Sequence, residues 1–354
     1  MAPADASSLR VPTSAADLTP EWLTQAIGGG TVVAADAKPV GTGQIADSIR
    51  IQLSWDPPGA GPESVVVKVT SSAEASRSAA QATRTYEVEV GFYRDLASSI
   101  PVNAPRCYWA GHDASTNGYA VVLDDKAPAK QGDQMAGCSV DEAALALDEA
   151  AYLHGARWGD PSVGELPWLS GGLGGPGMSG IIQMLAPGYL ERYDGRIAPE
   201  AVELIERYHE AVAASAPYAG PTTIVHNDFR NDNLLFGGER VCVLDWQTVS
   251  LGCGILDVSY FLGGSLLPED RRKAETDLVR GYHERLTAQG VELSWDDCWR
   301  EYRRNAFAGL TMAIIASSMV VRTDRGDEMF IAMGERAAFH AMEMDTEDLL
   351  RAGG

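Results

Sequence analysis

One short stretch of the chain concentrates the residue types that polar catalysis requires. Residues 224–247 read IVHNDFRNDNLLFGGERVCVLDWQ and place His226, Asp228, Asn233 and Asp245 beside runs of apolar residues. Asp and Asn oxygens without cysteine suit a hard cation, and Mg²⁺ takes one or two carboxylates while it keeps water and phosphate oxygens. Such a cation implies a nucleotide substrate.

The spacing of these residues suggests a division of roles. In H-x-D-x-x-x-x-N followed by an Asp after an apolar strand, one Asp accepts a hydroxyl proton while the Asn and the second Asp hold metal. Taken singly, each of these residues is more often a loop cap or a solvated carboxylate. Their occurrence together, around one glycine turn, favours catalysis.

A Gly-Gly pair at 237–238 predicts a tight two-residue turn between two short apolar strands. Its arms begin and finish at the same end, so we expect the four polar residues to meet. An ideal turn would place Cys242, not Asp245, opposite Asn233. The second strand is therefore expected to twist or to end at Leu244.

Two upstream features could bind phosphate. Gly41 and Gly43, in the sequence Gly-Thr-Gly-Gln, could let backbone amides approach phosphates, although a lone GxG more often marks a turn. Lys68 interrupts a run of valines, where a charge is costly unless it faces a cleft or a partner. The alternative is that Lys68 extends to water from a sheet edge.

A helix expected over 75–97 offers the partner for Lys68. Glu89 shares one face of this helix with apolar residues by its spacing. Glu87 is the competitor, but it lies off that apolar stripe.

The elements that must position these residues change in character along the chain. Alternating residues over 48–55 and the valine run over 64–70 predict an antiparallel hairpin. Thr19 and Pro20 open a short helix, and Ser139 with Glu142 forms a possible capping box. A Gly/Pro-dense loop is expected over 164–178. Further helices are expected over 140–158, 198–216, 268–290 and most of 296–343.

A strand-rich first third and a helix-rich remainder predict an α+β fold with two lobes. We expect a flexible arm over 1–18, a nucleotide-binding lobe over 19–125 and a catalytic and substrate-binding lobe over 126–354.

Composition limits the partners. The chain has 28 basic and 49 acidic residues, a net charge of −21, so its surface would repel nucleic acid and anionic membranes. Five scattered cysteines suggest neither a disulfide framework nor a zinc site, and a cytoplasmic protein is expected. The N-terminus does not resemble a secretory signal. The apolar stretch 306–321 is too short to span a bilayer and predicts a buried helix.

The order of GxG, VVVK, a helical Glu, VVLDD, HNDFRNDN and LDWQ resembles the aminoglycoside phosphotransferase and choline kinase-like superfamily, which has a protein-kinase-like fold. HxDxRxDNLLF followed by LDWQ is most similar to ecdysteroid kinase-like proteins and to phosphotransferase domains fused to acyl-CoA dehydrogenases. The resemblance runs from about Thr19 to the C-terminal helices. Asn227 replaces a common Gly, and Trp246-Gln247 replaces the Phe-Gly of protein kinases.

The resemblance implies roles in the proposed ATP and Mg²⁺ site. Asp228 would be the base and Asn233 and Asp245 the Mg²⁺ ligands, while Lys68 would hold the α- and β-phosphates with Glu89 orienting it. The segment from Leu123 to Asp125 would lie beside adenine. His226 would brace the loop, and Asp257 would tie it down or simply cap a helix. Arg230 would either neutralise carboxylates or touch phosphate.

Three functions follow as hypotheses. The first is an ATP-dependent O-phosphotransferase acting on a small hydroxylated molecule. The second is a catalytically silent nucleotide-binding pseudokinase. The third is a metal-dependent phosphohydrolase, which would have no use for Lys68 and Glu89.

The acceptor is expected to contact 164–195 and 296–335. The acidic charge would suit an aminoglycoside. The aromatic and Met content of 295–333 favours an apolar acceptor such as a steroid, terpenoid or hydroxyacyl thioester, although such a stripe is more often core. Its members are Trp295, Trp299, Phe307, Met312, Met319, Phe330 and Met333.

Overall fold

The computed structural model describes residues 9–41, 45–169, 176–320 and 322–352. The chain divides into two compact units. The N-terminal unit runs to Ser99 and includes Ala104–Pro128, whereas the C-terminal unit comprises Ile100–Asn103 and the chain from Ala129 onward. The predicted α+β class is confirmed. No helix within the described residues is long and apolar enough to cross a membrane.

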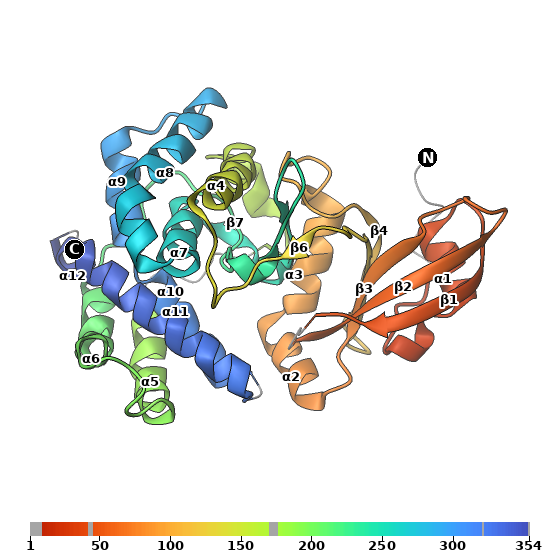
Figure 1. The fold of residues 1–354 in the computed structure, drawn as a ribbon, viewed down its shortest axis with the longest axis horizontal. Coiled ribbons are helices and arrows are strands. Elements are labelled where there is room, and N and C mark those ends of the chain that lie inside the picture. Colours follow the sequence, from red (N-terminus) through yellow and green to blue (C-terminus); the bar gives the residue numbers. More distant parts are fainter. Residues whose placement is uncertain (1–8, 42–44, 170–175, 321, 353–354) are drawn as a thin grey trace. The chain divides into compact units, whose positions relative to one another are not determined.

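A five-stranded antiparallel sheet forms the centre of the N-terminal unit (Figure 1). The sheet has the strand order β1-β2-β3-β5-β4. The hairpin predicted over 48–55 and 64–70 is confirmed as the β2–β3 pair. The strands are β1 (Thr31–Pro39), β2 (Ala46–Asp56), β3 (Ser64–Thr70), β4 (Cys107–Asp113) and β5 (Gly118–Asp124).

Alternation along β3 separates a hydrophobic face from a polar one. Val65, Val67 and Val69 are fully buried in a core that also contains Trp22 and Leu23 of helix α1 (Pro20–Ile27). Because successive side chains of a strand point to opposite faces, the intervening lysine projects away from this core. Helix α1 begins as predicted, with the Thr19 side chain accepting a hydrogen bond from the Trp22 amide.

The described part of the predicted flexible arm packs against this sheet. Leu18 belongs to the core, and Leu9 and Val11 pack on it. The carbonyl of Pro12 accepts a hydrogen bond from the Tyr119 amide at 3.0 Å. Residues 9–18 are therefore part of the N-terminal unit and not a loose arm.

The prediction of a single helix over 75–97 is wrong in one respect, because this segment forms two helices separated at Arg84. Helix α2 (Glu74–Thr83) ends at Arg84, which adopts a left-handed conformation with φ 58°. Helix α3 (Thr85–Gly91) follows and continues into the π-helical turn η3 (Phe92–Leu96). The predicted apolar face survives the break, since Glu89 and its neighbours Phe92, Tyr93 and Leu96 are all buried.

Helices dominate the C-terminal unit (Figure 1). Helix α7 (Ile255–Ser265) is buried over nearly its whole length and contacts α9, α10 and α11. The capping box predicted at Ser139 and Glu142 is confirmed at the start of α4. The remaining helices are α4 (Val140–Gly155), α5 (Pro176–Arg192), α6 (Pro199–Ala214), α8 (Pro268–Ala288), α9 (Trp295–Arg304), α10 (Ala308–Met319), α11 (Asp324–Glu343) and α12 (Thr346–Ala352).

Two small sheets carry the polar segment of the C-terminal unit. One has the order β6-β8-β9, and the other pairs β7 with β10. The strands are β6 (Lys130–Gln131), β7 (Thr223–Val225), β8 (Leu234–Phe236), β9 (Cys242–Val243) and β10 (Ser250–Gly252). Within the loop predicted over 164–178, residues 170–175 lie outside the described residues, and the last three belong to α5, which begins at Pro176.

Candidate active site

The hairpin formed by β8 and β9 has a different register from the predicted one. Leu234 pairs with Val243, and Leu235 pairs with Cys242. The loop therefore covers 237–240 instead of the two glycines alone. The Leu244 amide donates to the Asn233 carbonyl at 2.8 Å, so Leu244 faces Asn233 and the next residue, Asp245, follows directly. The longer loop removes the mismatch that a two-residue turn would create.

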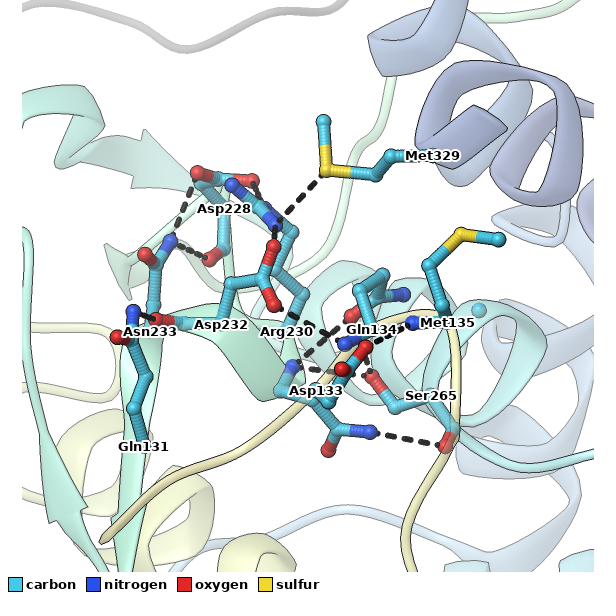
Figure 2. A network of polar contacts seen from close by, with 12 residues as sticks. Gln131, Asp133, Gln134, Met135, Asp228, Arg230, Asp232, Asn233, Ser265 and Met329 are labelled. Atoms are coloured by element: carbon cyan, nitrogen blue, oxygen red, sulfur yellow. Dashed lines mark hydrogen bonds and ion pairs between the residues drawn. The ribbon is translucent and has the colours of Figure 1, made fainter. Parts of the chain in front are cut away.

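Asn233 joins this hairpin to Asp228. Its Nδ2 atom donates to Oδ2 of Asp228 at 2.7 Å and to the Asp228 carbonyl at 2.8 Å. Figure 2 shows the two side chains directed toward each other. Asn233 is buried, whereas the Asp228 side chain retains 19% exposure. The Asp228 carboxylate is therefore oriented by Asn233 and remains partly exposed to solvent.

The other oxygen of Asp228 receives two more donors. Arg230 donates from Nε to Oδ1 at 2.9 Å, and the Tyr260 hydroxyl donates to the same atom at 2.8 Å. Burial and the nearby Asp228 carboxylate raise the pKa of Tyr260 well above its usual value, which keeps the hydroxyl protonated as a donor. Although burial opposes the charge, Asp228, Tyr260 and Asp232 raise the pKa of Arg230. No local pattern in the sequence pointed to Tyr260, because helix α7 lies beyond the motif.

His226 connects the segments that carry Asp228 and Asp245. Its Nε2 atom lies 2.9 Å from the Leu244 carbonyl, and its Nδ1 atom accepts from the Asp228 amide at 3.2 Å. These partners select the tautomer with the proton on Nε2. The ring is fully buried and packs against Trp246.

Asp257, in the first turn of α7, holds the loop before Asp228. Its Oδ2 atom accepts from the His226 amide at 2.7 Å, and its Oδ1 atom accepts from the Asn227 amide at 2.8 Å. His154 of α4 lies 3.1 Å from Oδ2 through Nε2. The carboxylate is fully buried, and these donors replace the water that it would otherwise bind. The sequence offered no signal for His154.

Asn227 occupies the position where the resembling family often has Gly. Its φ is +64°, in the left-handed region that glycine, asparagine and aspartate tolerate best. Its side chain donates to the Thr248 carbonyl at 2.6 Å and to the Ser250 hydroxyl at 2.7 Å. The substitution therefore keeps the required backbone conformation and adds side-chain hydrogen bonds.

In the N-terminal unit, Lys68 bonds to Glu89. The Nζ atom lies 2.8 Å from Oε1 of Glu89, whose carboxylate is fully buried and also accepts from the Tyr119 hydroxyl. Glu87 instead pairs with Arg84 at 2.8 Å on the exposed side of the helix. Between the two acidic residues, Glu89 is therefore the one in contact with Lys68.

The other candidate nucleotide-binding residues of the N-terminal unit differ in burial, hydrogen bonding and backbone conformation. Leu123 is buried within β5. Asp125 accepts hydrogen bonds from the Ser64 hydroxyl at 2.7 Å and from Nη2 of Arg50 at 3.2 Å. Its carboxylate is thus occupied within its own unit, which leaves its backbone for other contacts. Gly41 has φ +74°, and Gly43 lies outside the described residues.

The donor atoms near the hairpin fit Mg²⁺. Asn233 uses Nδ2 for Asp228, and within the described part of the chain no protein donor reaches its Oδ1 atom. Asp245, one residue past the Asn233–Leu244 pair, supplies a carboxylate. The described residues contain no cluster of three or more His, Cys, Asp or Glu suited to a metal. A cation held here would therefore need oxygens from a bound phosphate, as Mg²⁺ commonly does.

Asp232 is neither simply solvated nor a local cap. Its carboxylate lies 2.6 Å from Nη1 of Arg230 and accepts from the Gln134 amide at 3.0 Å (Figure 2). The sequence alone suggests a solvated residue or a local cap at Asp232, and these two contacts correct that expectation. Gln134 lies far from the motif in sequence, so local spacing could not reveal the second one.

Comparison with known families decides the class of the protein. The family model described as "Phosphotransferase enzyme family" matches residues 36–293, which is most of the chain. The chain belongs to this phosphotransferase family. A mouse protein, acyl-CoA dehydrogenase family member 10, is 32% identical over 95 residues, which are 26% of this chain and 8% of that protein.

Solved structures of this phosphotransferase fold cover nearly the whole chain. Choline kinase from Cryptosporidium parvum matches with a TM-score of 0.54 at 12% identity, over 90% of this chain and 92% of its own. The gentamicin complex of APH(2")-IIa matches with a TM-score of 0.53 at 20% identity, over 94% and 99% of the two chains. At these identities the similarity establishes the kinase-like fold. It leaves the substrate to the chemistry of the site.

Proposed function

We propose that this phosphotransferase moves the γ-phosphate of ATP to a hydroxyl of a small molecule. Family membership supports phosphoryl transfer. The contact of Asn233 with Asp228 carries the proposal, because it ties a proton acceptor to a metal-ligand segment. Asp245 lies at the end of the same hairpin.

Asp228 would act as the base. The acceptor hydroxyl oxygen would form a bond to the γ-phosphorus while the bond to the β–γ bridging oxygen breaks. ADP leaves, and the hydroxyl proton passes to the Asp228 carboxylate. Asn233 and Tyr260 would hold that carboxylate in the orientation needed for transfer, and such positioning supplies much of the rate of phosphoryl transfer.

Asn233, through Oδ1, and Asp245 would hold Mg²⁺. The cation would neutralise charge on the β- and γ-phosphates. His226 would act indirectly, since its two nitrogens fix the spacing between the proposed base and the segment of Asp245. Asp257 would hold the loop through two backbone amides.

The N-terminal unit would bind the nucleotide. Lys68 would hold the α- and β-phosphates, and buried Glu89 would fix its ammonium group. Leu123 and Asp125 would lie beside adenine, the latter through its backbone because its carboxylate binds Ser64 and Arg50. Gly41 would let a backbone amide approach phosphate, and Gly43 would do the same.

The acceptor is proposed to be a small hydroxylated compound. Phe307, Phe330 and Met333 of the aromatic and Met stripe are buried, so they form core and give no support for an apolar acceptor. Met329 lies close to the proposed base, since its sulfur accepts a hydrogen bond from Nη1 of Arg230 at 3.6 Å.

A coupled assay of ADP release tests the proposed function. The panel contains sugars, aminoglycosides, macrolides, sterols and hydroxyacyl thioesters, each with Mg·ATP. We expect one hydroxylated class to accelerate ADP release well above the rate without acceptor. Binding of Mg·ATP without transfer to any class would instead support a nucleotide-binding pseudokinase. Phosphate release from phosphoesters without ATP would support a phosphohydrolase.

A further inference from the structure

Arg230 lies between two carboxylates of the same loop. Its Nε atom donates to Asp228 at 2.9 Å, and its Nη1 atom donates to Asp232 at 2.6 Å (Figure 2). The three side chains are each less than one-fifth exposed. The Arg230 guanidinium thus binds two carboxylates at a largely buried site, where hydrogen bonds to charged groups are strong.

Asp232 is held in place from outside the motif. The Gln134 amide donates to its Oδ1 atom at 3.0 Å. Gln134 is itself buried, and its Oε1 atom accepts from the Asn231 amide at 3.0 Å. Arg336 of α11 donates to the Gln134 carbonyl at 2.9 Å. The position of Asp232 is therefore fixed by residues on both sides of the loop.

We propose that Asp232 is a positioning residue for Asp228 and acts through Arg230. This inference rests on the proposed role of Asp228 as the base. A guanidinium group prefers to bind one carboxylate with two parallel donors. Asp232 engages Nη1 and so keeps the guanidinium from turning fully onto Asp228. The Asp228 carboxylate is then oriented by Arg230 without being covered by it, and remains able to accept a proton.

The test uses the full chain and a double-mutant cycle. The variants are Asp232→Asn, Arg230→Gln and the two together, with Asp228→Asn as the reference for loss of the base. Asp133→Asn is the matched control, because it removes a neighbouring carboxylate that bonds to the Met135 and Ala136 amides and not to Arg230. The rate of ADP release from Mg·ATP, with water as acceptor, and ATP affinity are measured for each.

Asp232→Asn is expected to lower the turnover rate about tenfold, the scale of a lost hydrogen bond to a charged group, while ATP affinity stays within twofold. In the Arg230→Gln background, Asp232→Asn should cause no further loss of turnover rate, because Asp232 acts through Arg230. Asp133→Asn should stay within twofold of the wild-type rate. Additive losses, or a twofold or smaller effect of Asp232→Asn, would overturn the proposal.

An NMR measurement tests the positioning role of Asp232 independently of turnover. The ¹⁵N-labelled Nε–H signal of Arg230, assigned by its loss in Arg230→Gln, reports the bond to Asp228. We expect its hydrogen exchange to change at least about tenfold in Asp232→Asn and to stay constant in Asp133→Asn. An unchanged signal in Asp232→Asn would refute the positioning role. If Asp228→Asn keeps full turnover, the proposed function fails instead.

Discussion

Asn233 donates two hydrogen bonds to Asp228, one to its carboxylate at 2.7 Å and one to its backbone carbonyl at 2.8 Å. The same Asn233 accepts the Leu244 amide through its own carbonyl. The proposed base and the segment of Asp245 are therefore connected by one residue. The following predictions test the contacts that surround this connection and those of the N-terminal unit.

Removal of the Asp257 carboxylate should destabilise the loop before Asp228. Asp257→Ala leaves the amides of His226 and Asn227 buried without their acceptor. We expect the free energy of unfolding to fall by about 3 kcal/mol, measured by denaturant titration. The control is Asp277→Ala on the exposed side of α8, which should change it by less than about 0.5 kcal/mol. Equal effects of the two variants would contradict the role of Asp257 as a loop brace.

Two substitutions at Asn227 should lower the stability of the protein by different amounts. Asn227→Gly and Asn227→Ala both lose the bonds to Thr248 and Ser250, but only alanine must place a Cβ atom at φ +64°. Asn227→Ala should therefore be less stable than Asn227→Gly by about 1 kcal/mol in denaturant unfolding. The reverse order would show that backbone conformation does not govern this position.

Glu89 and Glu87 provide a matched pair on α3. Glu89→Gln weakens the buried contact with Lys68, whereas Glu87→Gln affects only an exposed pair with Arg84. We expect the first to lower phosphoryl transfer at least about tenfold, because a hydrogen bond between charged groups is worth about 2 kcal/mol. The second should stay within twofold. Comparable losses in both variants would argue against Lys68 as the phosphate-binding lysine.

Stability in acid should depend on Asp125. Burial would raise the pKa of this carboxyl, but hydrogen bonds from Ser64, the Ala127 amide and Arg50 hold it below the usual 3.8. Because the folded pKa is lowered, the carboxylate stabilises the fold above about pH 4 and this contribution is lost as pH falls through the folded pKa.

The variant Asp125→Asn tests this pH dependence. At pH 7 it should unfold with a free energy lower by about 1 kcal/mol, and the difference from wild type should shrink below about pH 4. Asp36→Asn on exposed β1, where Asp36 pairs only with exposed Lys38 among its described partners, is the control and should show little difference. A difference that is constant from pH 7 to pH 3 would show that the carboxylate charge is not responsible.

The sequence predicted the elements well because their patterns are local. Alternation gave the β2–β3 hairpin, and cap residues gave the starts of α1 and α4. The length of the loop over 237–240 was not predictable from its glycines. Arg240 binds the buried carboxylate of Glu149 and the Pro101 carbonyl, and these distant partners lie outside any local turn preference.

The candidate site was predictable only along the motif itself. Spacing predicted the meeting of Asp228 and Asn233, which lie 2.7 Å apart, but it could not reveal side chains that arrive from other elements. Tyr260 of α7 reaches Asp228, and Gln134 reaches Asp232 from the segment that precedes α4. Such contacts depend on how helices pack, which one sequence does not encode in any short pattern.

The central claim is that Asp228 accepts the proton of the hydroxyl to which phosphate is transferred. Transfer from Mg·ATP to the acceptor found in the screen, measured beside ATP affinity in wild type and Asp228→Asn, tests it most directly. We expect the variant to lose about 10³-fold in transfer rate, a typical contribution of general base catalysis, while it binds Mg·ATP within threefold of wild type. A transfer rate within tenfold of wild type would contradict the account.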